Sequence, residues 1–190
     1  ITKWNLSRFA ECLIPLIDQD EDKAVKSATE LIETFGKKYE ERWLNMMRSK
    51  LGLLGEENKD KFLIVDLLTW MHQNKVDYTN TFSHLMNLKD YDDDIYKDIN
   101  FQNWKKNWQE RLKLNNTSEN YIKLMRSVNP LVIPRNHKIE ESLEKANDGN
   151  LKPFNKLLEI LKKPYALQEN ITDYLKMNNS LKNYKTFCGT

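Results

Sequence analysis

The sequence predicts an all-α fold of about eight or nine helices, and two observations favour it. Apolar residues recur with helical periodicity along almost the entire chain, and we find no convincing alternation typical of β-strands. The 190 residues also include only five glycines and five prolines. Because a β-sandwich needs many turns, this composition argues against that architecture.

The first helix is predicted to begin at Thr2 or Lys3 and to carry one broad apolar face. We expect this face to pack in the core and to bury the thiol of Cys12. The residues on the face are Trp4, Leu6, Phe9, Cys12, Leu13, Leu16 and Ile17.

A long second helix is predicted from Glu21 or Asp22 to about Leu53, where Gly52 and Gly55 supply the stop. The next helix, 59–73, is apolar almost all round, which is typical of a helix at the centre of a core. All five tryptophans fall in apolar helical patterns, so core packing is favoured over base stacking. They are Trp4, Trp43, Trp70, Trp104 and Trp108.

In the second half of the chain, Asp77 is predicted to cap a helix that starts at Tyr78. Asn129-Pro130 ends a later helix and Pro164-Tyr165 ends a helical hairpin, because proline cannot continue a helix. The helices expected here are 78–88, 101–114, 117–128, 137–147, 151–161 and a weaker one near 171–177.

The length and pattern predict one helical domain over residues 1–165 and a loosely packed tail over residues 166–190. No apolar run approaches the roughly 18 residues that a membrane-spanning helix needs. A formal net charge of +2 offers no strong attraction to nucleic acid or an anionic membrane. We therefore expect neither nucleic acid nor a membrane as a partner. The acidic and the Lys-rich stretches are interpreted as solvated faces or, alternatively, as docking surfaces.

An irregular polar connection interrupts the helical pattern between Met125 and His137. Pro130 and Pro134 force extended backbone, and Arg135 and Asn136 follow directly. One interpretation is a structural elbow whose polar groups satisfy helix ends, with Arg135 and Asn136 bonded to backbone carbonyls or a nearby carboxylate. The other is a set of groups that grips a phosphate or a carboxylate.

This connection resembles the Asn-Pro and Arg-Asn signature of the selenoprotein O family, also called YdiU. Further matching residues follow in the order typical of that family, across nearly all of the chain. They are Trp4-Asn5-Leu6 with Leu13 and Pro15-Leu16, then Lys50-Leu51-Gly52-Leu53, then Asp77-Tyr78-Thr79 with Phe82, then Pro164-Tyr165 and a cysteine near the end.

The resemblance implies a kinase-like, or pseudokinase, protein adenylyltransferase that moves AMP from ATP to Ser, Thr or Tyr hydroxyls with Mg or Mn. The family's nucleotide and metal ligands precede the Trp-Asn-Leu segment. We therefore expect this chain to correspond to the helical C-terminal lobe plus a C-terminal extension. Within it we expect no catalytic residue, no cofactor-binding residue and no metal ligand.

The same resemblance implies two partners, the missing N-terminal half of the protein and the protein substrates of the full-length enzyme. It also implies a cytoplasmic location for a bacterial sequence, or a mitochondrial one for a eukaryotic sequence. The runner-up hypothesis, from a different class, is a non-catalytic helical module that binds a protein partner.

Two residues, Ser83 and Gly189, depart from the family pattern, and Cys188 is a candidate for a reactive thiol. Ser83 stands where the family pattern suggests an arginine, which puts a phosphate or partner contact there in doubt. Cys188 lies in a polar, unpatterned tail, so we expect it, rather than Cys12, to be the reactive, redox-capable thiol. The family's cysteine-bearing tail resembles this one, although the position that carries selenocysteine in some eukaryotes is Gly189 here.

Overall fold

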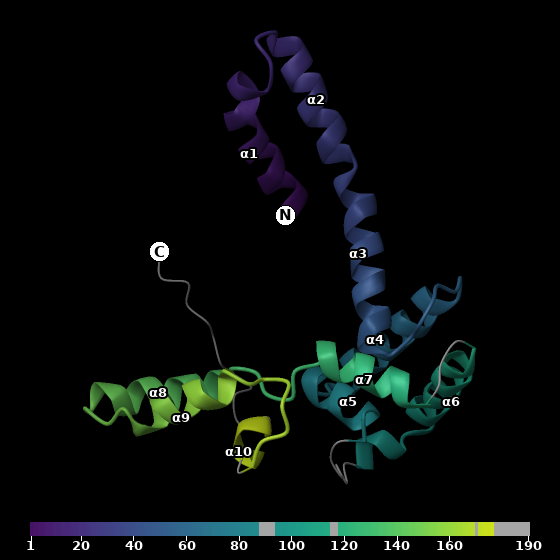
Figure 1. Cartoon of the computed structure of the whole chain (residues 1–190), viewed down its shortest axis with the longest axis vertical. Coiled ribbons are helices and arrows are strands. Elements are labelled where there is room, and N and C mark those ends of the chain that lie inside the picture. Colours follow the sequence, from purple (N-terminus) through teal and green to yellow (C-terminus); the bar gives the residue numbers. More distant parts are fainter. Residues whose placement is uncertain (88–93, 115–117, 170, 177–190) are drawn as a thin grey trace. The chain divides into compact units, whose positions relative to one another are not determined.

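The computed structural model describes residues 1–87, 94–114, 118–169 and 171–176. Within these residues the fold is all-α, as predicted, and Figure 1 shows only helices and connecting loops. The described elements are α1 to α10 and a short 3-10 helix, η1, between α5 and α6. The predicted domain limits at residues 165 and 166 stay a prediction, while the internal contacts divide the chain into two compact units, Ile1–Met47 and Arg48–Thr190.

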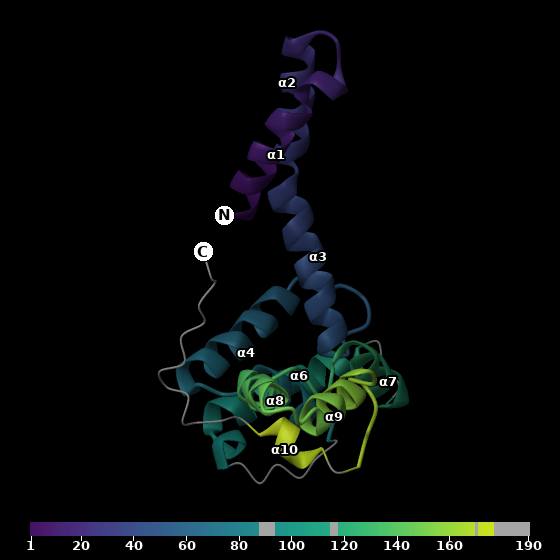
Figure 2. The same cartoon turned by 90° about the vertical axis from the view of Figure 1, so that its left-hand side faces the viewer.

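The first unit is built on a helical hairpin, in which α1 (Thr2–Ile17) lies alongside α2 (Glu21–Glu33; Figures 1 and 2). Asp20 starts α2, because its side chain accepts a hydrogen bond from the Lys23 backbone N–H. Ala24 and Ala28 are buried, and such small side chains let two helices approach closely. An ion pair of 2.9 Å also joins Lys3 of α1 to Glu33 of α2.

The predicted burial of the α1 face is wrong. None of the residues of α1 is buried, Trp4 is 65% exposed, and Cys12 is exposed as well. The apolar stripe of α1 is broad, whereas a single neighbouring helix covers only a narrow band of it. The assignment of Trp4 and Cys12 to the core is therefore corrected.

The second predicted helix is in fact two helices, α2 and α3 (Phe35–Lys50), separated at Thr34. The Thr34 hydroxyl and the Thr34 backbone N–H both donate to the Leu31 carbonyl, at 2.7 and 3.2 Å. Side-chain bonding of this kind competes with the helical ladder, and the low helix propensity of Gly36 weakens the next turn. The boundary between the two units falls within α3.

The core of the second unit centres on α4 (Asp60–Asn74) and α6 (Ile99–Lys113), which pack against each other. Burial of Ile64, Leu67 and Phe101 supports the central position predicted for α4. Aromatic side chains form a continuous row where α4 meets α6, and the ring centroids of Trp70 and Phe101 lie 4.6 Å apart. Stacked pairs extend the row from Phe101 through Trp104 to Trp108. The outer side of α4 differs from the prediction, because Phe62 is 71% exposed.

Around this core lie α5 (Tyr78–Leu85), η1 (Asp94–Lys97), α7 (Ser118–Val128), α8 (Asn136–Asn147), α9 (Lys152–Leu161) and α10 (Thr172–Leu175). The predicted hairpin is confirmed, since α8 and α9 run side by side in both views (Figures 1 and 2). The Pro164 carbonyl accepts from the backbone N–H groups of Leu131 and Val132, at 2.7 and 3.3 Å. This contact fixes the end of the hairpin against the irregular connection that precedes it.

Candidate functional site

Arg135 and Asp77 lie 58 positions apart in the sequence and meet at the starts of two helices. Arg135 Nη1 donates to Asp77 Oδ2 at 2.8 Å, and Arg135 Nη2 donates to Asp77 Oδ1 at 3.1 Å. A further bond of 3.2 Å runs from Nη2 to Asn80 Oδ1. Two parallel bonds of this kind fix the guanidinium in orientation as well as in position.

The Asp77 carboxylate also caps α5, as predicted, because it accepts the Asn80 backbone N–H at 2.7 Å. A negative charge is favourable there, next to the positive end of the helix dipole. The Asn80 side chain then donates to the Leu175 carbonyl at 3.2 Å, which brings α10 into the same network. The connection before α8 is thus tied to α5 and α10 by charge-assisted bonds.

Asn136, the other residue of the predicted pair, lies apart from this network. It is the first residue of α8 and is exposed, and its side chain has no hydrogen bond to another described residue. His137 is partly buried beside it. Burial, together with the charges of Lys138 and Arg135, lowers the pKa of His137. The structure therefore brings Arg135 and Asp77 together and leaves Asn136 outside, while Cys188 lies outside the described residues.

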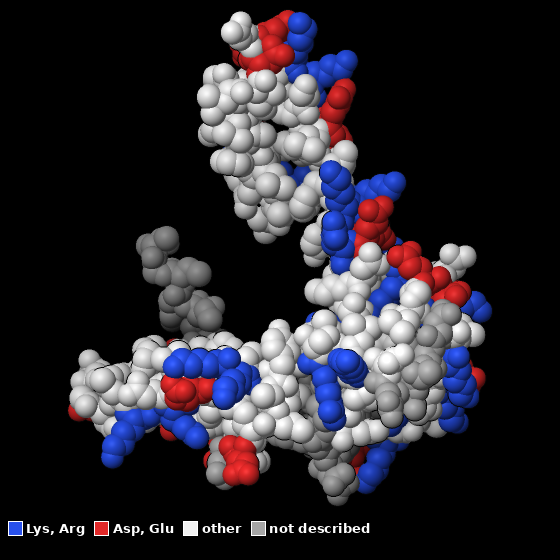
Figure 3. Space-filling view, in the orientation of Figure 1, with Lys and Arg blue, Asp and Glu red and all other residues white. Residues whose placement is uncertain are grey.

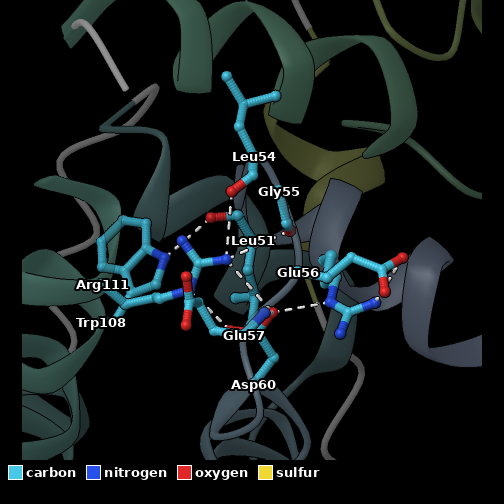
Figure 4. Close-up of polar contacts among 9 residues, drawn as sticks. Leu51, Leu54, Gly55, Glu56, Glu57, Asp60, Trp108 and Arg111 are labelled. Atoms are coloured by element: carbon cyan, nitrogen blue, oxygen red, sulfur yellow. Dashed lines mark hydrogen bonds and ion pairs between the residues drawn. The ribbon is translucent and has the colours of Figure 1, made fainter. Parts of the chain in front are cut away.

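A second polar cluster, which the sequence did not reveal, lies at the start of α4 (Figure 4). Asp60 is 1% exposed and sits between two buried arginines. Arg48 Nε donates to Asp60 Oδ2 at 2.7 Å, and Arg111 Nε donates to Asp60 Oδ1 at 2.7 Å. The Glu57 backbone N–H adds a bond of 3.0 Å to Oδ2.

Two opposing effects act on the pKa of Asp60. Burial raises it, but the hydrogen bonds from Arg111, the Glu57 N–H and Arg48, with the charge of Arg111, hold the pKa of this carboxyl below its ordinary value. The carboxylate is therefore ionised at neutral pH. It compensates two buried guanidinium groups, of which Arg111 has no other carboxylate partner among the described residues, while Arg48 also pairs with the exposed Glu56, 3.3 Å from its Nη1.

The same cluster fixes the loop that follows Lys50. Arg111 Nη2 donates to the carbonyls of Leu54 and Gly55, at 3.1 and 3.2 Å, and Trp108 Nε1 donates to the Leu51 carbonyl at 2.8 Å (Figure 4). Each bond satisfies a backbone oxygen of this loop, which begins after α3 ends at Lys50. The loop is thereby held against α6.

Gly52 has a left-handed backbone at φ +70° in this loop. A Cβ at this position would lie 2.9 Å from the Cβ of Tyr121. Only glycine combines that backbone with that approach at no steric cost. The motif glycine is therefore required by close packing of the loop on α7.

Lys50 and Asn129 connect two of the motifs that carry the family resemblance. Lys50 Nζ donates to Asn129 Oδ1 at 3.0 Å, and Asn129 Nδ2 donates to the Lys50 carbonyl at 2.8 Å. The ammonium also lies over the rings of Tyr78 and Phe82, 5.4 and 4.9 Å from their centroids. Burial lowers the pKa of Lys50. Residues from separate motifs, Lys50, Asn129 and the Tyr78 and Phe82 rings, thus meet in one contact.

Comparison with known proteins identifies the family of the chain. The profile of a family described as "Protein adenylyltransferase SelO" matches residues 1–162. The chain belongs to the SelO family. Proteins named "Protein nucleotidyltransferase YdiU" are similar along the whole chain. The one from Pelagibacter ubique (strain HTCC1062) is 53% identical over 192 residues, and that from Alcanivorax borkumensis is 42% identical over 193 residues.

Each of these alignments covers 100% of this chain and 40% of the SelO relative. The chain therefore spans about two fifths of the length of the curated relatives it matches. Among the described residues, no group of three or more His, Cys, Asp or Glu side chains is arranged to hold a metal ion. No described helix is long and apolar enough to cross a membrane.

The sequence singled out Asp77 and Arg135 separately, but it predicted neither the pair that they form nor the cluster around Asp60. Asp77 carries the local signature of a helix cap, whereas Asp60, Arg48 and Arg111 look like ordinary charged residues of amphipathic helices. A usable signal was present, since Arg111 follows Trp104 and Trp108 on the apolar face of α6. A charged residue on such a face predicts a buried counter-charge.

Proposed function

We propose that this chain is the helical C-terminal part of an enzyme that transfers AMP from ATP to Ser, Thr or Tyr hydroxyls of proteins. In that reaction the hydroxyl oxygen bonds to the α-phosphorus, the bond to the β-phosphate breaks, and pyrophosphate leaves. The match to the SelO family over residues 1–162 carries the proposal, because it covers the first unit and most of the second. The names of the relatives support the same general activity, nucleotidyl transfer to protein.

In this proposal, ATP and Mg or Mn belong to the part of the protein that this chain does not span. The described residues offer no cluster suited to a metal, and the Arg135 guanidinium is occupied by Asp77 and Asn80. The chain contributes the helical lobe of a kinase-like fold. Its two buried polar clusters hold helix starts and loops in place, which is the kind of positioning on which phosphoryl and nucleotidyl transfer depend. We further propose a cytoplasmic location.

A chimera tests the proposal directly. The matching 192 residues of the Pelagibacter ubique relative would be replaced by this chain, and the product incubated with ATP labelled at the α- or the γ-phosphate. We expect protein-bound label from α-labelled ATP alone, at a level close to that of the intact relative. The isolated chain should incorporate neither label. The intact relative is the positive control, and folding of the chimera is checked by circular dichroism.

Other outcomes would contradict the proposal. Label from the γ-phosphate would indicate a kinase, and robust AMP incorporation into the isolated chain would place the catalytic groups within these residues. A folded chimera without activity, beside an active relative, would favour the alternative of a non-catalytic helical protein-binding module.

A further inference from the structure

Two hollows on the surface of the second unit share the residues Asp66 and Asn107 and so form one continuous groove between α4 and α6. The larger hollow has a volume of about 970 Å³, and the smaller one about 350 Å³. We call this feature the α4–α6 groove. Its size suits several side chains of a bound segment rather than a single ion or water.

The larger hollow is flanked by apolar side chains that remain in solvent. Phe62 of α4 is 71% exposed and Leu114, just after α6, is 62% exposed, while Leu63, which also lines the hollow, is partly buried. Large exposed apolar groups beside a concave surface are typical of binding sites, because a partner gains free energy by covering them. The apolar part of the groove therefore predicts an apolar anchor on the occupant.

Charge at the same hollow is predominantly negative. Its lining includes four carboxylates, of Glu57, Asp60, Asp66 and Glu110, against two basic groups, of Lys59 and Arg111. Asp60 is compensated by Arg48 and Arg111, and Glu110 pairs with Lys113. Glu57 and Asp66 make no ion pair with a described residue. An occupant with a lysine or arginine beside its apolar anchor would complement these two carboxylates.

The rest of the groove offers bonds to a peptide backbone. Gln73, Asn103 and Asn107 line it with amides, each of which can donate and accept. Nucleic acid is disfavoured because its phosphates would meet Glu57 and Asp66.

We propose that the α4–α6 groove binds a protein segment that combines apolar residues with at least one lysine or arginine. This inference is independent of nucleotidyl transfer, because it rests on the exposure and the charge of groove residues and on no contact with a nucleotide.

Binding of a defined peptide tests the proposal with the 190-residue chain. The probe is a fluorescein-labelled 14-residue helix-forming peptide with leucines on one face and lysines beside them, and the matched peptide has glutamate in place of lysine. Fluorescence anisotropy should show at least about tenfold tighter binding of the lysine peptide. Phe62→Ser and Asp66→Lys should each weaken that binding about tenfold.

The control variants are Val65→Ser, which alters an exposed residue of α4 outside the groove, and Glu30→Lys, a charge reversal in the first unit. Neither should change the affinity. Because Phe62 and Asp66 are exposed, thermal melting should show all four variants folded. Equal binding of the two peptides, or binding unaffected by Phe62→Ser and Asp66→Lys, would overturn the proposal. So would self-association of the chain that Phe62→Ser abolishes without any binding of the lysine peptide.

Discussion

Arg111 and Asp60 lie 51 positions apart and share two hydrogen bonds, of 2.7 Å from Nε to Oδ1 and 3.3 Å from Nη2 to Oδ2. Both side chains are almost fully buried, and Arg48 bonds to the same carboxylate. Removing one partner of a buried ion cluster lowers the stability of the fold strongly, because the remaining charges stay desolvated without compensation. The cluster therefore makes the start of α4, the preceding loop and α6 dependent on one another.

Removing the charge of Asp60 should destabilise the second unit strongly. Asp60→Asn keeps the shape of the side chain but leaves the buried Arg111 without a counter-charge and Arg48 paired with the exposed Glu56, so we expect a loss of about 3–5 kcal/mol in the free energy of unfolding. Urea denaturation followed by circular dichroism measures it. Asp66→Asn is the matched control on the exposed side of the same helix and should change stability by less than about 0.5 kcal/mol. Equal midpoints for the two variants would show that the ion cluster contributes little.

Lowering the pH should remove the difference in folding stability between wild type and Asp60→Asn. The pKa of Asp60 is lower in the folded than in the unfolded chain, where it is near 3.8. A lowered carboxyl pKa stabilises the fold above the unfolded pKa, and this contribution disappears as pH falls through the folded pKa. The stability gap between the two proteins should be constant from pH 7 to about pH 5 and shrink below about pH 4. A gap that stays constant down to pH 2 would contradict the assignment of the charge to Asp60.

The contrast between the two clusters shows what the sequence could reveal. Helix α4, the Asp77 cap and the Asn129-Pro130 stop depend on neighbouring residues, so local pattern was sufficient. The Lys50–Asn129 contact and the Asp60 cluster join residues from distant segments, and nothing in the local pattern specifies such partners. The apolar face of α1 predicted burial, but the pattern does not specify a surface that would cover it. The break at Thr34 involves a side-chain hydrogen bond that the apolar pattern does not indicate.

The Arg135–Asp77 pair should affect stability rather than chemistry. Arg135→Ala removes the bonds to Asp77 and Asn80 and leaves a largely buried carboxylate, so we expect a loss of about 1–3 kcal/mol. Arg135→Lys should recover only part of it, because an ammonium cannot form the two parallel bonds. Arg126→Ala, an exposed arginine on α7, is the control. If Arg135→Ala melts like wild type while AMP transfer by the active chimera collapses, the residue has a direct role in the site.

Two glycine variants separate backbone strain from steric overlap. Gly52 and Gly149 both have left-handed backbones, at φ +70° and +82°, but only a Cβ at Gly52 meets neighbouring atoms within 4 Å. Gly149→Ala should cost about 1 kcal/mol from backbone strain alone. Gly52→Ala adds a Cβ 2.9 Å from the Cβ of Tyr121, so its loss should be larger by about 1–3 kcal/mol. Equal losses in urea denaturation would show that α7 moves aside freely.

Cys12 should be accessible to alkylation in the folded chain, contrary to the expectation from its apolar pattern. The residue is exposed on α1, and its thiol makes only a weak hydrogen bond, with 3.5 Å from Sγ to the Arg8 carbonyl. Access limits the reaction of a thiol in a folded protein, so iodoacetamide should label Cys12 within about tenfold of its rate in urea. Peptide mass mapping reads each cysteine separately, and Cys12→Ser identifies the signal. Protection of Cys12 until the chain unfolds would show that a surface covers the apolar face of α1 in solution.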